Sequence, residues 1–344
     1  MTSGANFSPA AIAPTVGAGL ANSLLEYAVS RGADEAVLRD CAGIAPGLLD
    51  DADNRVAFAN YVALMRAAKD VLGADFPLRF AQASDMAEFS VVGLLANASE
   101  TMMDSFAQLN RYGRLVVEVD VGGEGRFRME SRENGMWLVD LRPDPNDFYE
   151  LTETTFTRMI TGPRKFLPRP HVFEAHVTHA APAHRAVYDE MWACPITFSA
   201  PSNALRMDMS LANHRVRQES KYAFGPLSVH AEQLLKDLED SKTARGRVES
   251  LLMPILHTGD VSMDTIAAKL ALSRQTLYRN LKAEGVTFEQ VLDELRHKLA
   301  LHYLSGKKVS VNETAYLVGF SDPAAFSRAF KRWTGMSPRA ARGA

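Results

Sequence analysis

Two stretches near the C-terminal end carry side chains that suit contact with a polyanion, SRQTLYRNLKAEG (273–285) and SDPAAFSRAFKRWTG (321–335). When the first stretch is plotted as a helix, Leu277 and Leu281 lie on one side. The other side carries a polar and basic set that covers roughly 140° of the helix surface: Arg274, Gln275, Tyr278, Arg279 and Lys282. The second separates an apolar stripe of Phe326, Phe330 and Trp333 from Ala324, Ser327, Arg328 and Lys331. Arginine can donate two hydrogen bonds to guanine, and glutamine can pair with adenine. The pattern therefore predicts two short helices that read nucleic acid.

Each of these helices needs a second helix to brace it. MDTIAAKLAL (263–272) and NETAYLVGF (312–320) precede them, and their small residues allow a close helix crossing, as in a helix-turn-helix. Gly319 suits the tight turn of the second unit, and Ser310 with Glu313 has the spacing of a capping box. The sequence thus repeats one element, with these equivalent pairs: Ala267/Ala315, Leu272/Phe320, Ser273/Ser321 and Arg279/Arg328. The offset changes from 48 to 49 residues, which indicates a one-residue insertion or deletion.

A single amphipathic segment, TFEQVLDELRHKLALHYLSGKK (287–308), joins the two units. Thr287 and Gln290 form a second capping-box pattern at its start. A helix of about 17 residues spans ~25 Å, so the two recognition helices are expected to sit about one duplex turn, ~34 Å, apart. One polypeptide could then enter two successive major grooves.

Charge divides the chain in the same way. Residues 242–344 hold 16 Lys and Arg against nine Asp and Glu, a balance of +7, which leaves −10 for residues 1–241 in a chain of net charge −3. A basic tail and an acidic front predict that only the tail binds a polyanion. The chain has two cysteines, no basic start typical of a secretory signal and no apolar run near the ~20 residues that span a bilayer. We therefore expect a cytoplasmic protein that does not enter a membrane.

The front of the chain shows mixed periodicity. Residues 1–15 are small and proline-broken and are expected to be disordered, whereas helical patterns follow from Leu20 onward. Alternation predicts strands at 116–121, 126–130, 136–141, 171–179, 196–198 and 204–208. These patterns predict an α+β domain over residues 16–240, followed by an all-α domain over 241–344. The polar stretch SKTARGR (241–247) marks the expected boundary and hinge, after a helix over 226–240.

These motifs carry a family resemblance. The last ~100 residues resemble the DNA-binding domain of the AraC/XylS family of bacterial transcription regulators, most specifically in VNETAYLVGFSDPAAFSRAFKRWTGMSP (311–338). The front resembles the arabinose-binding-type N-terminal domain of members related to ornithine-utilisation and virulence regulators, in residues 89–112 and 179–208. The resemblance implies an effector-binding or dimerisation domain and two helix-turn-helix motifs joined by a linker helix. The chain departs from the family at Arg339-Ala340-Ala341-Arg342, where a Tyr-Arg pair is usual.

The resemblance also implies which side chains contact DNA. Base edges would be contacted by Gln275, Tyr278, Arg279, Ala324, Ser327 and Arg328. Phosphates would be contacted by Arg274, Lys282, Lys331 and Arg332, and at the helix N-termini capped by Ser273 and Asp322.

Metal and enzyme chemistry are the alternatives to a regulator. Four histidines, His171, His176, His179 and His184, lie near Cys194, but His176 and His179 would face opposite sides of a strand. Neither cysteine has the Pro-Cys-His-Arg setting of alkyl-transfer DNA repair. We therefore expect no metal, no cofactor and no catalytic residue.

The sequence as a whole predicts a transcription regulator, expected to be an activator, that binds double-stranded promoter DNA and a small effector. RNA polymerase and a second copy of the chain are the expected protein partners, and the helix over 226–240 is expected to transmit the effector signal. The alternative is a constitutive DNA-binding protein whose front only dimerises. The sequence identifies neither the effector nor its binding residues.

Overall fold

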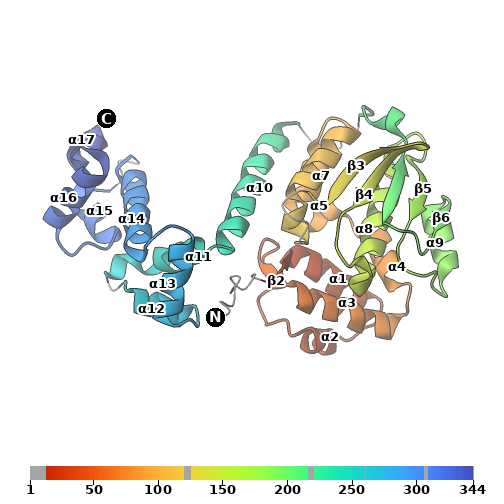
Figure 1. Ribbon diagram of the computed structural model, residues 1–344, viewed down its shortest axis with the longest axis horizontal. Helices are drawn as coiled ribbons and strands as arrows, with labels where there is room; N and C mark the ends of the chain where they lie inside the picture. The colour runs from red at the N-terminus through yellow and green to blue at the C-terminus, as the bar shows by residue number, and fades with distance from the viewer. Residues whose placement is uncertain (1–12, 120–124, 216–220, 260, 306–308, 344) are drawn as a thin grey trace, which may run out of the picture. The chain divides into compact units, whose positions relative to one another are not determined.

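The computed structural model describes residues 13–119, 125–215, 221–259, 261–305 and 309–343. The chain divides into two compact units, Ala13–Leu235 and Lys236–Ala344. The division falls within the long helix α10 (Lys221–Ser241). The N-terminal unit is α+β and the C-terminal unit is all-helical, as expected from the sequence (Figure 1). Among the described helices, none is both long enough and apolar enough to cross a bilayer.

Helices dominate the first half of the N-terminal unit. Its elements are β1 (Thr15–Gly17), α1 (Ala18–Ser30), α2 (Glu35–Ala42), β2 (Arg55–Ala57), α3 (Phe58–Leu72), α4 (Phe76–Ala83), α5 (Met86–Phe89), α6 (Val91–Ala98) and α7 (Met102–Val116). They enclose one apolar core in which Leu24, Tyr61 and Leu64 are fully buried. Thr101 starts α7 with a capping box to Asp104, which fixes where the chain re-enters the helix.

A five-stranded sheet forms the second half. Its strands are β3 (Phe127–Arg132), β4 (Gly135–Asp140), β5 (Val172–His176), β6 (Ile196–Thr197) and β7 (Ala204–Met207), in the order β3-β4-β7-β5-β6. Only the β5–β6 pair is parallel. Helices α8 (Glu150–Thr161) and α9 (Arg185–Trp192) bury Phe156, Tyr188 and Trp192 against it.

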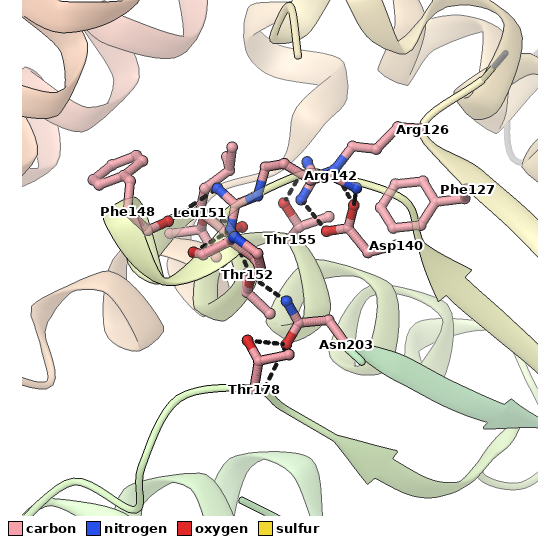
Figure 2. A network of polar contacts seen from close by, with 12 residues as sticks. Arg126, Phe127, Asp140, Arg142, Phe148, Leu151, Thr152, Thr155, Thr178 and Asn203 are labelled. Carbon is pink, nitrogen blue, oxygen red and sulfur yellow. Dashed lines mark hydrogen bonds and ion pairs between the residues drawn. The ribbon is translucent and has the colours of Figure 1, made fainter. Parts of the chain in front are cut away.

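Helix α8 belongs to both cores. Leu151 packs with the helical layer, and Phe156 and Ile160 pack beneath the sheet. A polar network ties the start of α8 to the strands (Figure 2). In it, Arg142 donates to Phe148 O at 3.0 Å and to Thr152 Oγ1 at 2.8 Å, and Asn203 donates to the same hydroxyl at 3.3 Å.

Two expectations for the N-terminal unit were wrong. The strand expected over 116–121 is absent from its described part, residues 116–119: α7 runs to Val116, and Val117 makes only an isolated bridge with Val16. Residues 120 and 121 lie outside the described residues. The valines are apolar on alternate positions because they cover the first core, where Val117 is 8% exposed, and not because a strand lies beside them. Order begins before residue 16, since Thr15 pairs with Ala57 in the β1–β2 ribbon; the expected disorder of residues 1–12 lies outside the described part.

The C-terminal unit consists of α11 (Ala244–Leu252), α12 (Met263–Lys269), α13 (Arg274–Ala283), α14 (Phe288–Ser305), α15 (Val311–Leu317), α16 (Pro323–Thr334) and α17 (Pro338–Gly343), with a 3₁₀ turn at Met253–Thr258. One continuous apolar cluster runs from Val248 to Phe330. The expected hinge over 241–247 is mostly wrong, because α11 already begins at Ala244. A side chain at Gly246 would lie 2.1 Å from Asp240 O, so this polar stretch is a close helix contact.

Candidate nucleic-acid interface

Helix α13 presents the first basic surface. Ser273 caps it by accepting a hydrogen bond from Thr276 N at 3.1 Å, and Leu277 and Leu281 are buried at 0% and 1% exposure. The remaining side chains of the expected set are exposed: Arg274, Gln275, Tyr278, Arg279 and Lys282. The apolar side faces the core, and the polar side is therefore free for a partner.

Helix α16 presents the second. Asp322 accepts hydrogen bonds from Ala324 N and Ala325 N, both at 3.0 Å, and Pro323 follows at the first helical position. Phe326 and Phe330 are fully buried. Ala324, Arg328, Lys331 and Arg332 are exposed, and Ser327 is half-buried.

The two helices match residue by residue, but in a register that differs from the expected one at their start. Ser273 and Asp322 are the N-caps, so they are equivalent, and the Ser273/Ser321 pairing was wrong. Ser321 is the inserted residue and lies in the turn ahead of the helix. The offset is then 49 along both exposed faces, which pairs Gln275 with Ala324, Tyr278 with Ser327, Arg279 with Arg328 and Lys282 with Lys331.

The turns before the two helices adopt the same left-handed backbone. Ala271 has φ +53° in the first and Gly319 has φ +80° in the second. At Gly319 a Cβ would also lie 2.2 Å from Leu256 O, because the 3₁₀ turn of the first unit packs against this point. Gly319 therefore fixes how the two helix-turn-helix units join, a larger role than the turn alone predicts.

Arg296 on α14 fastens the same turn. Its Nε donates to Val318 O at 3.1 Å and its Nη2 donates to Gly319 O at 3.3 Å, while the guanidinium lies 4.8 Å from the centre of the Phe320 ring. The sequence pattern does not single out Arg296, because an arginine on a linker helix has the pattern of a solvent-exposed position. Only the long-range fold brings it to the turn.

Helix α14 holds the two units apart. Thr287 and Gln290 make the expected reciprocal capping bonds, Thr287 N to Gln290 Oε1 at 2.8 Å and Gln290 N to Thr287 Oγ1 at 3.2 Å. Its 18 residues correspond to a length of about 27 Å. Val291 and Leu295 are buried in the shared core, so the helix is a supported strut and not a free linker.

The basic side chains of α13 and α16 differ in whether they form an ion pair with an acidic side chain. Arg279 and Lys331 have no acidic partner in the described part of the chain. Arg274 pairs with Asp264 and Arg332 with Asp293, each at 2.7 Å, but both pairs are exposed. Exposed pairs contribute at most about 1 kcal/mol, so a phosphate can replace the carboxylate.

The two N-caps are not alike electrostatically. Backbone hydrogen bonds from Ala324 and Ala325 hold the pKa of Asp322 below its usual value, so a negative charge occupies the start of α16. Ser273 is a neutral cap, and it leaves the positive end of α13 open to an anion. A phosphate would meet like charge at Asp322 but not at Ser273.

Comparison with known proteins agrees with this geometry. Residues 32–216 match the family described as the arabinose-binding domain of AraC transcription regulators, and residues 266–344 match a helix-turn-helix domain family. The chain belongs to the AraC family. This AraC-family protein is a DNA-binding transcription regulator with an arabinose-binding-like N-terminal domain.

Relatives of this regulator span most of its length. The ornithine utilization regulator of Pseudomonas aeruginosa is 28% identical over 331 residues, covering 92% of this chain and 93% of its own. The transcriptional regulator VirS of Mycobacterium tuberculosis is 27% identical over 308 residues, covering 86% and 87%. The transcriptional activator RhaS of Escherichia coli is 42% identical over 81 residues, which is 23% of this chain and 29% of its own.

The four histidines considered as metal ligands make other contacts. His171 Nε2 lies 2.9 Å from Met159 O, and burial lowers the pKa of His171 to about 4. His176 contacts Glu174 at 2.9 Å, and its ring lies 4.5 Å from that of Trp137. His179 and His184 lie on either side of Tyr188. No group of three or more His, Cys, Asp or Glu side chains within the described ranges is placed to hold a metal ion.

Cys194 is held as a thiol. Burial raises the pKa of Cys194 to about 11, so little thiolate is present at neutral pH, and the thiolate is the nucleophilic form. We expect Cys194→Ala to leave promoter binding in a gel shift and reporter output unchanged. A variant that binds promoter normally but loses reporter output would show that the thiol takes part in the function.

Proposed function

We propose that this regulator reads a two-part promoter site with α13 and α16. Base edges are contacted by Gln275, Tyr278, Arg279, Ala324, Ser327 and Arg328. Phosphates are contacted by Arg274, Lys282, Lys331, Arg332 and the N-terminus capped by Ser273. One observation carries this proposal: at a constant offset of 49 residues, the two helices present equivalent side chains, all exposed except the half-buried Ser327, on either end of one strut.

Asp322, also expected at a phosphate, is assigned to helix capping alone. Both of its carboxylate oxygens already accept backbone hydrogen bonds, and its charge repels phosphate. It also lies 4.0 Å from Arg328, where it can orient that guanidinium towards a base.

Arg279→Ala and Arg328→Ala test the base contacts. Each change should weaken binding at the cognate site by about 1–3 kcal/mol and relax the choice of base at one position, because a bidentate guanine contact is lost. Lys331→Ala should instead weaken binding to all sequences alike and lower the salt dependence. Binding to a randomised duplex library, selected and sequenced, measures both effects.

Arg339→Ala is the matched control for these variants, since Arg339 is exposed on α17 and lies on neither basic face. Unchanged base preference in both Arg279→Ala and Arg328→Ala would contradict the assigned contacts. A genome-wide map of bound promoters would then supply the natural site and its neighbouring genes.

The N-terminal unit, in this proposal, senses a small effector in the cytoplasm and shifts the regulator towards its DNA-competent state. The match to an arabinose-binding domain family supports sensing, and the activator named among the relatives supports activation through RNA polymerase. A homodimer would place two such chains on one promoter. The competing function, constitutive DNA binding with a front that only dimerises, requires promoter affinity to be independent of every small molecule.

A further inference from the structure

The interior arginines of the N-terminal unit donate to a carboxylate or to backbone carbonyls, with one exception among the described residues. Arg126 pairs with Asp140 through both carboxylate oxygens, at 3.0 and 2.6 Å. Arg142 donates to the carbonyls of Pro145 and Phe148, and Arg164 donates to those of Met191 and Trp192. Arg158 has neither a carboxylate nor a carbonyl partner in the described part of the chain.

Arg158 projects from α8 towards the helical layer. Its Nε and Nη2 both donate to one oxygen, Ser84 Oγ, at 3.3 and 2.9 Å. The guanidinium carbon lies 4.8 Å from the centre of the Phe80 ring and 5.7 Å from that of Phe89. Desolvation by these surroundings lowers the pKa of Arg158 below its usual value, yet an arginine stays protonated at neutral pH. A half-buried cation with five donors thus has a single neutral acceptor.

Tyr61 on α3 carries a second unsatisfied group, which lies within range of the Arg158 charge. Its side chain is fully buried, and its hydroxyl has no hydrogen-bond partner among the described residues. Burial raises the pKa of Tyr61 to about 12, against the opposing influence of the Arg158 charge. The phenol is therefore protonated and able to donate. Buried polar groups are rarely left unpaired, because desolvation without a replacement hydrogen bond is unfavourable.

We propose that Arg158, Tyr61 and Ser84 bind the carboxylate of a small apolar monocarboxylate, which is the effector of this regulator. A guanidinium fork matches a carboxylate, and one cation balances one negative charge. Phe80 and Phe89, both buried, flank the guanidinium, so the surroundings of the carboxylate are apolar. As a statement about the effector this rests on the sensing function proposed above, whereas the site itself does not.

Titration calorimetry and thermal unfolding of the full chain test the site with benzoate and hexanoate, at constant ionic strength. Both carboxylates should stabilise the protein, and benzamide and hexanamide should not. Arg158→Gln should raise Kd for the carboxylates about 10- to 100-fold, and Tyr61→Phe should raise it several-fold. Arg79→Gln is the matched control: Arg79 lies on the same helix as Phe80 but pairs with Asp75 at the surface.

The unliganded variants show whether Arg158 is structural instead. Arg158→Gln should melt no lower than the wild type, because it removes an unpaired interior cation. Arg158→Lys keeps the charge without the fork and should bind carboxylates with intermediate Kd. The proposal is overturned by a large fall in the melting temperature of unliganded Arg158→Gln, by equal stabilisation from the amides, by no response to either carboxylate, or by Arg158→Gln binding as well as the wild type.

Promoter affinity, measured by fluorescence anisotropy with and without benzoate, separates this site from the sensing function. A change in the wild type that is absent in Arg158→Gln supports both. Carboxylate binding that leaves promoter affinity unchanged would keep the site and refute its role in sensing.

Discussion

Gly319→Ala is expected to unfold or reorient the second helix-turn-helix unit and to abolish specific DNA binding. An alanine at φ +80° costs about 1–2 kcal/mol in backbone strain. Its Cβ would also meet Leu256 O at 2.2 Å, so the backbone of one unit must move away from the other. Together we expect a loss of about 3 kcal/mol or more in the stability of the C-terminal unit. Hydrogen exchange of peptides from α15 and α16 would measure it directly.

Ala271→Gly is the matched change at the equivalent turn. Because Ala271 already has φ +53° and is exposed, glycine should relieve strain and leave the free energy of unfolding unchanged or raised by up to about 1 kcal/mol. DNA affinity should stay normal. Equal and small effects of the two substitutions would mean that the contact with Leu256 does not hold the units together.

Asp140→Asn is expected to destabilise the N-terminal unit by about 3–5 kcal/mol, since it leaves Arg126 as an interior cation without a carboxylate and with only the Thr155 hydroxyl as a side-chain acceptor. Asp140 also accepts from Arg142 N at 3.1 Å, so the loss reaches the network that ties α8 to β4 (Figure 2). Urea unfolding with hydrogen exchange over β4 and α8 gives the measurement. Asp189→Asn, which removes an exposed pair with Arg185, should change stability by less than about 1 kcal/mol.

The same pair predicts how stability depends on pH. Burial alone would raise the pKa of Asp140, but the charge and hydrogen bonds of Arg126 outweigh it and hold the pKa below the usual value. A carboxylate with a lowered folded-state pKa stabilises fully above its unfolded value of about 4, and that contribution is lost as the pH falls further. The difference between wild type and Asp140→Asn should therefore be constant near neutrality and shrink below about pH 4.

Local signals predicted much of the C-terminal unit. Capping residues such as Ser310 and Thr287 bond to residues within one helical turn, so the sequence alone predicts them. The buried stripes of α13 and α16 follow from helical periodicity for the same reason. The cap of α16 was assigned correctly to Asp322, but its equivalence to Ser273 appeared only when both helix starts were placed.

Long-range contacts account for what was missed. Val117 and Val119 alternate like a strand but pack on the helical core, and nothing local to 116–121 distinguishes the two cases. The sequence suggests a hinge at Gly246, because the sequence pattern does not show that the backbone of Asp240 packs closely against this glycine. Arg158 and Arg296 had no sequence signal at all, since a single arginine on a helix is usually at the surface.

The polar faces of α13 and α16 are equivalent in position but differ in chemistry. The four equivalent positions carry Gln275, Tyr278, Arg279 and Lys282 on α13, and Ala324, Ser327, Arg328 and Lys331 on α16. The two helices of a bound monomer would therefore prefer different half-sites. In the proposed binding mode, inverting the recognition sequence would reverse the order in which α13 and α16 meet the duplex.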